Sequence, residues 1–401
     1  MPRELSHVFD RYMKTKPIFK DKFYLQSNYL PDEVEHRDKE INLIAEILAS
    51  SLRMEKPSNL FIYGKTGTGK TLSIQYTIKQ LLQTAEANNL PVTILYINCK
   101  LKKIADTEYR IIAQFIRELG KDVPPTGLPT DEVYKIFINI IEQRKQIVIL
   151  VLDEIDQLVK KAGDEILYNL TRVNTELKKA QLSIIGISND LMFADNIDPR
   201  IKSSLSEEEL VFPPYNAFQL KEILKERAKI AFVDKVIQPG LIEKCSAYAA
   251  RDHGDARRAV ELLRVAGELA ERVGSKIVDI EHLDKAEEKI EKDRIIDIVS
   301  TQPKQHQLVL YSIIKIAEKN KKMIFTGEIY EYYKDACAHV SIRPLTQRRV
   351  SDIIAEFDML GIIYGKIISK GRYGRTREVA LSIPSESKIK VKQILKDALD
   401  I

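Results

Sequence analysis

Short apolar runs alternate with amphipathic segments through the first half of the chain. The segments between the runs, such as residues 72–82 and 109–119, carry apolar residues every three or four positions, which is typical of helices. Strands that alternate with helices indicate βαβ units and a parallel sheet with covered faces. We therefore predict an α/β fold, with strands at residues 59–63, 92–98, 147–152, 182–188 and 209–212.

The strand pattern stops after Pro213 and Pro214. The periodicity then predicts a helical unit with helices at 216–231, 239–251, 255–273 and 279–293. A polar stretch at 300–305 predicts a linker or a helix boundary. Three more helices and two strands follow, at 306–319, 326–339, 344–360, 362–369 and 377–383. The 401 residues thus divide into three expected domains, at 1–213, 214–298 and 299–401.

Composition excludes several classes of protein. Hydrophobic residues make up 44% and charged residues 30%, which supports packed cores and excludes wholesale disorder. The longest aliphatic run, 147–152, is too short to cross a bilayer, and the N-terminus has no apolar signal segment. The three cysteines, Cys99, Cys245 and Cys337, lie too far apart to suggest a zinc module or a disulfide framework. We therefore expect a cytoplasmic protein with no membrane partner.

The net charge of +5 is unevenly distributed. From Thr301 onward there are 18 Lys and Arg residues against 11 Asp and Glu, whereas the first 300 residues are slightly acidic. A local basic excess suggests a polyanionic partner for the last quarter of the chain alone. A lysine-rich solvated surface is the alternative explanation.

Residues 64–71, GKTGTGKT, match the pattern G-x-x-x-x-G-K-[ST] between a predicted strand and a predicted helix. Gly64, Gly67 and Gly69 allow backbone N–H groups to turn toward phosphate oxygens, and the helix N-terminus adds its positive dipole end. We expect Lys70 to reach the β- and γ-phosphates and Thr71 to bind Mg²⁺.

An apolar strand at 147–152 ends in Asp153 and Glu154, at the sheet edge where α/β folds bind ligands. Asp153 is expected to hold hydrated Mg²⁺, and Glu154 to polarise the attacking water, which favours nucleotide hydrolysis over kinase chemistry. Helix capping by these acids is the alternative. Asp156 could join the site, although a solvated surface position is the stronger expectation.

Two further polar positions are candidates for the same site. Asn189 follows a predicted strand and could orient the lytic water, with a simple turn as the alternative. Arg257 and Arg258 begin a predicted helix, for which Asp255 is a plausible N-cap. Two arginines in a first helical turn oppose the helix dipole, and a nearby anion would offset that cost. Arg257 is therefore a candidate nucleotide contact, unless it pairs with a surface acid.

The last quarter predicts a nucleic-acid module. Apolar residues at 345, 350, 353, 354, 357 and 360 share one helical face, and no acid lies between 366 and 377. A helix followed by a basic hairpin is typical of a winged helix on double-stranded DNA. A helical partner-binding module with a solvated hairpin is the alternative. The candidate DNA contacts are Thr346, Gln347, Arg348, Arg349, Lys370, Arg372, Tyr373, Arg375 and Arg377.

Together these motifs resemble the AAA+ ATPases, and more closely the archaeal origin-recognition initiators, relatives of the eukaryotic origin-recognition and cell-division-control proteins. The resemblance covers nearly the whole chain and implies an AAA+ base, a helical lid and a C-terminal winged helix. It is carried by Tyr29-Leu30-Pro31, His36-Arg37, GKTGTGKT, LDEID (152–156), ISND (187–190), DPRIKSSL (198–205), FPPY (212–215) and GDARRA (254–259).

The resemblance also implies residue roles. Lys70 and Thr71 match Walker A, Asp153 and Glu154 match Walker B, and Asn189 matches sensor one. Sensor two matches Arg257, although Arg258 stays open as an alternative. Arg200 matches an arginine finger that would act on a neighbouring subunit, with an ordinary surface arginine after Pro199 as the alternative. The implied nucleotide contacts further include Tyr29, Leu30, Arg37, Thr68, Leu72, Tyr215 and Arg227.

The implied activity is slow, regulatory hydrolysis of ATP to ADP with Mg²⁺ by an origin-binding initiator. Its implied partners are double-stranded origin DNA, paralogous initiator subunits and an MCM-type replicative helicase. A DNA-contacting insertion is expected at 100–109 or at 124–130. An NTPase-linked transcription regulator and a clamp-loader-type AAA+ ATPase are the rival interpretations.

Overall fold

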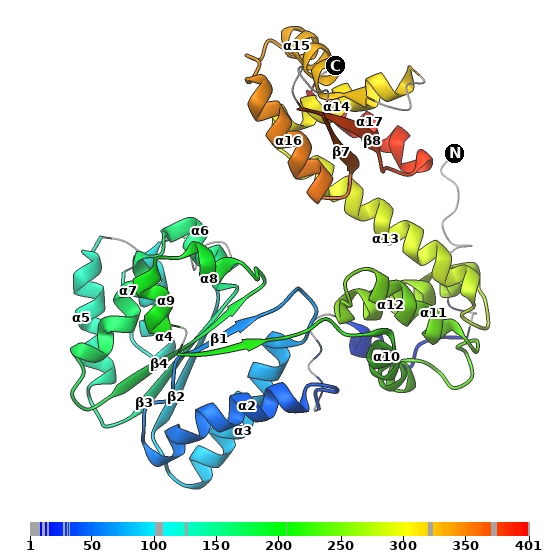
Figure 1. Cartoon of the computed structure of the whole chain (residues 1–401). Coiled ribbons are helices and arrows are strands. Elements are labelled where there is room, and N and C mark those ends of the chain that lie inside the picture. The colour runs from blue at the N-terminus through cyan, green and yellow to red at the C-terminus, as the bar shows by residue number, and fades with distance from the viewer. Residues whose placement is uncertain are drawn as a thin grey trace. The chain divides into compact units, whose positions relative to one another are not determined.

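The computed structural model describes residues 9, 13, 16–26, 29, 31, 33–100, 107–124, 127–205, 207–319, 324–369 and 375–399. The chain forms two compact units, Met1–Leu283 and Asp284–Ile401 (Figure 1). The boundary between them falls within helix α13 (Ile280–Thr301).

The first unit is built on a parallel five-stranded sheet in the order β2-β3-β4-β1-β5. The prediction of an α/β fold is confirmed, and every strand boundary lies within one residue of the expected position. Strand β3 is buried along its whole length, because its two neighbours and the helices on both faces cover it. The strands are β1 (Leu60–Tyr63), β2 (Val92–Asn98), β3 (Ile147–Asp153), β4 (Gln181–Ser188) and β5 (Glu208–Val211).

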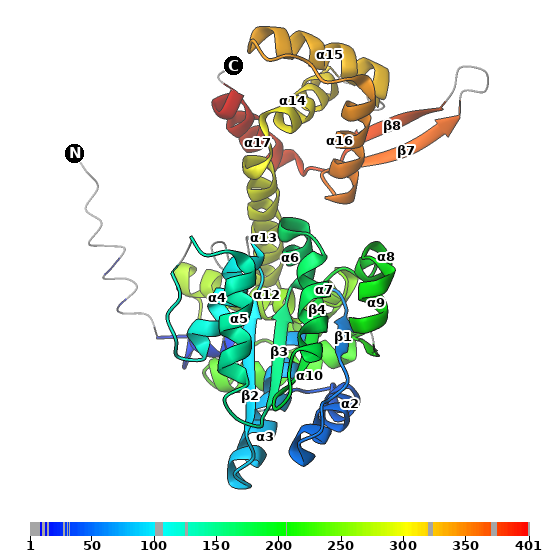
Figure 2. The same cartoon turned by 90° about the vertical axis from the view of Figure 1, so that its left-hand side faces the viewer.

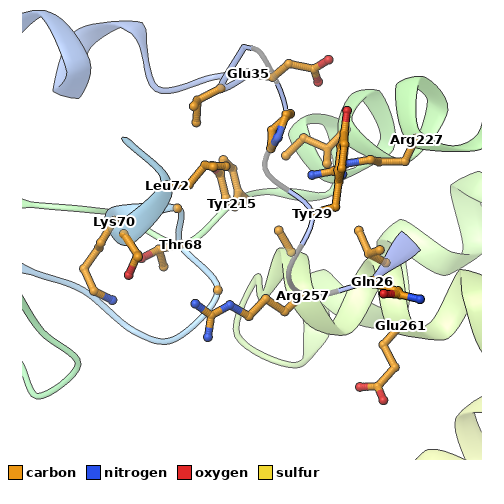
Figure 3. Close-up of a pocket in the computed structure, with 18 of the residues that line it drawn as sticks. Gln26, Tyr29, Glu35, Thr68, Lys70, Leu72, Tyr215, Arg227, Arg257 and Glu261 are labelled. Carbon is orange, nitrogen blue, oxygen red and sulfur yellow. The ribbon is translucent and has the colours of Figure 1, made fainter. Parts of the chain in front are cut away.

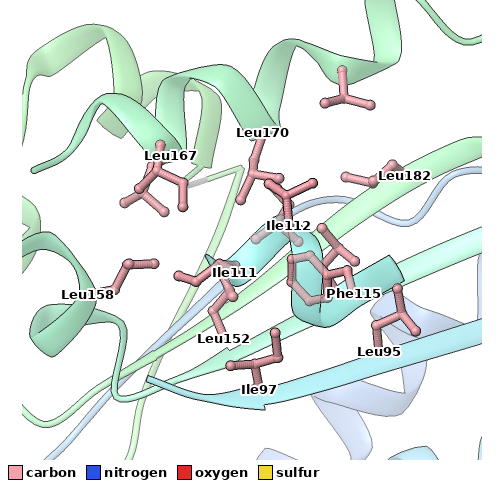
Figure 4. Packing of buried hydrophobic residues seen from close by; sticks show 14 of the residues in the cluster. Leu95, Ile97, Ile111, Ile112, Phe115, Leu152, Leu158, Leu167, Leu170 and Leu182 are labelled. Atoms are coloured by element: carbon pink, nitrogen blue, oxygen red, sulfur yellow. The ribbon is translucent and has the colours of Figure 1, made fainter. Parts of the chain in front are cut away.

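Helices cover the two faces of the sheet, and the alternation of side chains along each strand separates two cores. Leu150 and Leu152 pack under α4 (Glu108–Glu118), α5 (Thr130–Ile141), α6 (Ile155–Ala162) and α7 (Glu165–Arg172), as Figure 4 shows for part of this core. Ile149 and Val151 point the other way, toward α2 (Asp38–Leu48) and α3 (Lys70–Ala87).

Parallel strands bring the predicted motifs to one edge of the sheet. Strand β1 leads into the glycine-rich loop, β3 into Asp153 and Glu154, and β4 into Asn189. Because β3 pairs with β4 and β4 pairs with β1, these three carboxyl ends are neighbours. Two short helices, α8 (Phe193–Asn196) and α9 (Pro199–Leu205), follow β4.

A helical lid follows the sheet and is built from α10 (Ala217–Ala231), α11 (Leu241–Arg251) and α12 (Ala256–Val273). An N-terminal segment, which includes the 3₁₀ helix Lys22–Leu25, packs on this lid. Phe19 contacts the ring of Phe232, and a Cβ on Gly267 would come within 2.3 Å of Phe19, so only glycine allows this close packing. An ion pair of 2.7 Å joins Lys22 to Glu271 beside it.

The second unit is a winged helix, as predicted. Its elements are α14 (Lys304–Glu318), β6 (Ile324–Phe325), α15 (Thr326–His339), α16 (Gln347–Met359), β7 (Ile363–Ser369), β8 (Arg375–Leu381) and α17 (Ser385–Leu399). Strands β7 and β8 pair antiparallel as a ribbon beside α16 (Figure 2). The polar stretch at 300–305 marks a helix boundary, one of the two predicted alternatives. Helix α13 continues to Thr301, beyond its predicted end at residue 293, and α17 was not predicted.

Among the residues that the structure describes, no helix has the length and apolarity needed to span a bilayer.

Candidate functional site

A pocket of about 690 Å³ lies where the carboxyl edge of the sheet, the N-terminal segment and the lid meet. This volume is in the range of small-molecule and cofactor sites. Most of the predicted nucleotide-site residues line it: Tyr29, Gly67, Thr68, Gly69, Lys70, Thr71, Leu72, Asp153, Glu154, Asn189, Tyr215, Arg227 and Arg257. Figure 3 shows how several of them face this space from the base and from the lid.

The glycine-rich loop connects β1 to α3 and requires glycine at its turn. Gly67 and Gly69 have φ angles of +68° and +89°, in the region that side chains disfavour. A Cβ on Gly69 would also come within 2.6 Å of the Tyr215 hydroxyl. The loop backbone can therefore approach a ligand closely, directly before the N-terminus of α3.

Lys70 lies buried inside this loop. Its Nζ donates hydrogen bonds of 2.7 Å to the carbonyl oxygens of Gly64 and Lys65. Burial lowers the pKa of Lys70 to about 8, although the negative charge of Asp153 acts to raise it. A phosphate group at this position would supply the negative charge that favours the ammonium form.

Asp153 is 3% exposed and accepts three hydrogen bonds. Thr71 Oγ1 and the Tyr96 hydroxyl donate to its Oδ2 at 2.9 and 2.6 Å, and the Glu154 N–H donates to Oδ1 at 2.9 Å. Burial, reinforced by the charge of Asp153, raises the pKa of Tyr96, so this phenol stays a neutral donor. The buried carboxylate is thereby held in one orientation.

Glu154 has a φ angle of +55°, a left-handed conformation that is uncommon for a residue with a side chain. It lies between the end of β3 and the start of α6, so the chain turns sharply there. Its side chain lines the pocket, with Oε2 3.7 Å from Lys100 Nζ. Strain of this kind persists where surrounding structure enforces it, and it often accompanies functional sites.

The expectation that Asp156 lies on the solvated surface is wrong, because this residue is 4% exposed. Its Oδ1 accepts a hydrogen bond of 3.4 Å from the Ser188 hydroxyl, and the Asn189 N–H lies 3.5 Å from it. Asp156 therefore supports the turn after β4 that carries Asn189 into the pocket wall.

The structure separates the two neighbouring arginines of α12. Arg257 lines the pocket, and its guanidinium points toward the loop that carries Thr68 and Lys70 (Figure 3). Arg258 turns away and pairs with Asp252 at 2.8 Å. Asp255 is the helix N-cap, as predicted, and accepts from the N–H groups of Arg257 and Arg258. Base and lid also touch directly, since the Ala256 N–H donates to the Gly67 carbonyl at 3.1 Å.

The opposite end of the pocket is aromatic. Tyr29 lines it, and the guanidinium carbon of Arg227 lies 4.2 Å from the Tyr29 ring centroid. Burial lowers the pKa of Arg227. A tyrosine ring against a guanidinium forms a flat surface suited to a stacked base. Leu30, predicted beside Tyr29, lies outside the described residues.

Arg37 does not line the pocket, which corrects its predicted role as a direct contact. The Arg37 side chain is 1% exposed, and its guanidinium carbon lies 4.0 Å from the centroid of the Tyr215 ring. It donates to the carbonyl oxygens of Thr68 at 2.9 Å and Pro213 at 2.6 Å, and to Glu40 at 3.1 Å. Gly64 likewise lies outside the lining.

Several lining residues were missed from the sequence. Seven of them lie on one face of α10 or one face of α12, and for these seven the spacing of three and four residues is the signal that could have found them. They are Ile223, Glu226, Ile230, Ala256, Val260, Glu261 and Arg264, together with Leu25, Gln26 and Gln75. Pro31, Glu33, Val34 and Glu35 also line the pocket and fall in the segment from Tyr29 to Arg37, which the resemblance places on the adenine side. Among them, Glu35 has its pKa raised by burial.

Arg200 lies outside the pocket of its own chain. Its side chain is 75% exposed and forms a two-point contact with Asp198, at 2.8 and 3.1 Å. These contacts hold the pKa of Asp198 at about 2. The exposed guanidinium is therefore pre-oriented by an acid two residues earlier in the chain.

In the second unit, α16 presents the predicted apolar face, with Val350, Ile353, Ile354 and Phe357 buried. Gln347 and Arg348 are exposed at its first turn, whereas Thr346 is the N-cap, accepting from the Arg349 N–H at 3.4 Å. The Arg349 guanidinium lies 3.2 Å from Glu356 and 4.0 Å from Asp352.

The predicted wing contacts are only partly described. Lys370, Arg372 and Tyr373 lie outside the described residues, as does the side chain of Arg375. Arg377 lies over Gly365, where a Cβ would come within 2.8 Å of its Cδ, and its Nη1 is buried. It is therefore less available to a ligand than predicted.

A glycine-rich loop, paired acids after β3 and a three-helix lid define an AAA-type nucleotide-binding module, which this chain combines with a winged helix. Family models agree over most of the chain: an AAA domain at 53–191, the Cdc6 AAA+ ATPase-type lid domain at 221–288 and the CDC6 C-terminal winged helix domain at 297–391.

The comparisons extend to whole proteins. The ORC1-type DNA replication protein of Thermococcus onnurineus is 50% identical over 396 residues, which is 98% of this chain and 94% of that protein. The ORC1-type DNA replication protein 1 of Methanosarcina acetivorans is 50% identical over 391 residues, 97% of this chain and 94% of that protein. The structure of Aeropyrum pernix ORC1 in complex with DNA matches with 44% identity and a TM-score of 0.82, covering 95% of this chain and 97% of that one. The chain belongs to the ORC1-type family of AAA+ DNA replication initiators.

Proposed function

We propose that this protein binds ATP and double-stranded origin DNA and helps to load the replicative helicase. The observation that carries the proposal is the combination, in one chain, of a pocket lined by the glycine-rich loop, Asp153 and Glu154 with a winged helix, at 50% identity to ORC1-type replication proteins along 98% of the chain.

ATP would bind with its phosphates on the glycine-rich loop and its base between Tyr29, Arg227 and Tyr215. Lys70 and Arg257 supply positive charge at the phosphate end. Thr71 and Asp153 present oxygen donors suited to Mg²⁺, which when bound would neutralise phosphate charge. The oxygen chemistry of these side chains therefore fits the ion that the family implies.

Hydrolysis requires a water oriented for attack. We assign Glu154 as the residue that polarises this water and Asn189 as the residue that orients it, because both line the pocket and follow the neighbouring strands β3 and β4. The direct contact of Ala256 with Gly67 couples the lid to the phosphate loop. Slow turnover with bound ATP acting as a conformational switch fits this arrangement. Arg200 would complete the site of a paralogous subunit.

The winged helix would place α16 on DNA. Gln347 and Arg348 are exposed at its N-terminal turn, and residues 301–401 carry the whole basic excess of the chain. The related ORC1 of Aeropyrum pernix was solved in complex with DNA, which supports the same activity here. The candidate insertion segments, 100–109 and 124–130, fall partly outside the described residues and remain a prediction.

The domain division at 1–213, 214–298 and 299–401, an MCM-type helicase as partner and a cytoplasmic, nucleoid-associated location are part of the same proposal. It is tested by mapping the bound sites genome-wide. We expect peaks at replication start points. Peaks confined to promoters would support the transcription-regulator alternative, and failure of the full chain to bind duplex DNA at low salt would support a clamp-loader-type machine.

A further inference from the structure

The carboxylate of Asp153 is held by donors from three different elements. Thr71 comes from the first turn of α3, the Glu154 N–H from the chain after β3, and Tyr96 from β2. The Tyr96 contact is the shortest of the three, at 2.6 Å. Tyr96 is also the only one of these three donors that lies next to no recognised sequence motif.

Sheet register explains why Tyr96 reaches this carboxylate. Asn98 pairs with Asp153 and Tyr96 with Val151, so Tyr96 and Asp153 point to the same face of adjacent strands. A residue one position earlier or later would face the opposite core, as Leu95 and Ile97 do. The long phenol spans the two-residue offset that separates the pair.

The surroundings add to the role. Asp153 is 3% exposed, so water cannot replace a lost donor easily. Gln75 of α3, which lines the pocket, lies beside the same phenol. A chain of contacts therefore runs from the pocket wall through Tyr96 to the carboxylate. Tyr96 and Thr71 share Oδ2, so Tyr96 alone would hold that oxygen once the Thr71 hydroxyl turned to a metal ion.

We propose that Tyr96 is a positioning residue for nucleotide-bound magnesium, holding Asp153 in the orientation that receives the hydrated ion. The inference rests on the proposed function, because it assumes that ATP and Mg²⁺ occupy this pocket. Residues that orient metal-binding groups typically contribute about 10–100-fold to metal affinity. Nucleotide binding without metal should not depend on Tyr96, because its hydroxyl contacts Asp153 and does not line the pocket.

The test uses the full chain, a fluorescent ATP analogue and Tyr96→Phe, which removes one oxygen and keeps the ring. Analogue affinity is measured first in EDTA and then across a MgCl₂ titration. Tyr134→Phe is the matched control, because Tyr134, like Tyr96, is a half-buried tyrosine whose hydroxyl donates to a carboxylate, Glu108 Oε1 at 2.8 Å, away from the pocket. Thermal melting reports folding for each variant.

We expect Tyr96→Phe to raise the half-effective Mg²⁺ concentration by about tenfold or more while its affinity in EDTA stays within about twofold of wild type. Tyr134→Phe should match wild type in both. An unchanged magnesium response in Tyr96→Phe, an equal change in both variants, or an equal loss with and without metal would each overturn the inference.

A second measurement tests the inference with a double variant, so that the conclusion does not depend on Tyr96→Phe alone. In an Asp153→Asn background, adding Tyr96→Phe should change the magnesium response no further, because the two residues act as one unit. Additive effects would contradict the inference. If wild type itself bound no adenine nucleotide, the proposed function would fail. If wild type bound nucleotide with a magnesium response that Tyr96→Phe left unchanged, only the role of Tyr96 would fail.

Discussion

Lys70 makes nucleotide binding sensitive to pH. Burial lowers its pKa to about 8, and phosphate binding requires the charged form. Below about pH 8 the ammonium is already present, so affinity should vary little with pH. Above it, the free protein must take up a proton to bind, and affinity should fall by up to about tenfold per pH unit.

Calorimetry with ATP in EDTA, in buffers of different ionisation enthalpy, checks this prediction. We expect uptake of about one proton at about pH 9 and almost none at about pH 7. Lys70→Ala should abolish binding throughout, because it removes the cation beneath the phosphates. Affinity that is constant across this range, without proton uptake, would contradict a buried Lys70 with a lowered pKa.

Glu154→Gln should separate binding from turnover. The amide keeps the size of the side chain but cannot take a proton from water, so hydrolysis should fall by about 100-fold or more. ATP affinity should stay within a few-fold of wild type, because the phosphate contacts come from the glycine-rich loop and Lys70. Phosphate release under single-turnover conditions measures the first quantity and calorimetry the second. Hydrolysis at the wild-type rate would remove Glu154 as the base.

At the scale of elements, Arg37 ties three parts of the first unit together. Its guanidinium joins the start of α2 to the glycine-rich loop at Thr68 and to the chain between β5 and the lid at Pro213. Arg37→Lys keeps the charge but cannot make the same set of bonds. We expect the free energy of unfolding to fall by about 2–4 kcal/mol, which lowers the melting temperature, and we expect weaker ATP binding.

Arg53→Lys is the matched control, because Arg53 is exposed near the end of the same helical region. It should leave melting and affinity within error of wild type. If Arg37→Lys melted like Arg53→Lys, the carbonyl contacts would not stabilise the unit as the geometry indicates.

Elements were predictable wherever their signal is local. The buried strands read as apolar runs, and the glycine-rich loop is a contiguous motif between a strand and a helix. The last helix, α17, does bury Val391, Leu395 and Leu399 at four-residue spacing, so its pattern was present in the sequence. Strand β6 is two residues long and gives no periodicity at all.

The site was predictable only for residues that belong to such motifs. In the sequence, Tyr96 looks like any aromatic residue of a strand. Its contact with Asp153 depends on the register of β2 against β3, which the sequence pattern does not specify. Arg37 resembles a ligand contact until the fold places it beneath the loop. The lid residues that line the pocket depend on how α10 and α12 pack, which no local pattern specifies.

Charge is unevenly distributed over the whole molecule, because the basic excess lies in residues 301–401 and the first 300 residues are slightly acidic. We therefore expect the exposed arginines of the second unit to bind DNA. Arg348 is exposed on α16 and has no ion pair within the described part of the chain, whereas Arg349 pairs with Glu356 and Asp352. Arg348→Ala should therefore weaken duplex binding by about tenfold or more, and Arg349→Ala by less than about threefold.

Fluorescence anisotropy with labelled duplex across a salt series measures both effects. If Arg348 contacts a phosphate, its loss should reduce the slope of log affinity against log salt by about one; if it contacts a base, the loss should differ between origin and unrelated duplexes. ATP affinity should be unchanged in either variant, because both residues lie outside the nucleotide pocket. A larger effect for Arg349→Ala would show that its acidic partners release it on DNA, and would place the main contact one residue further along α16.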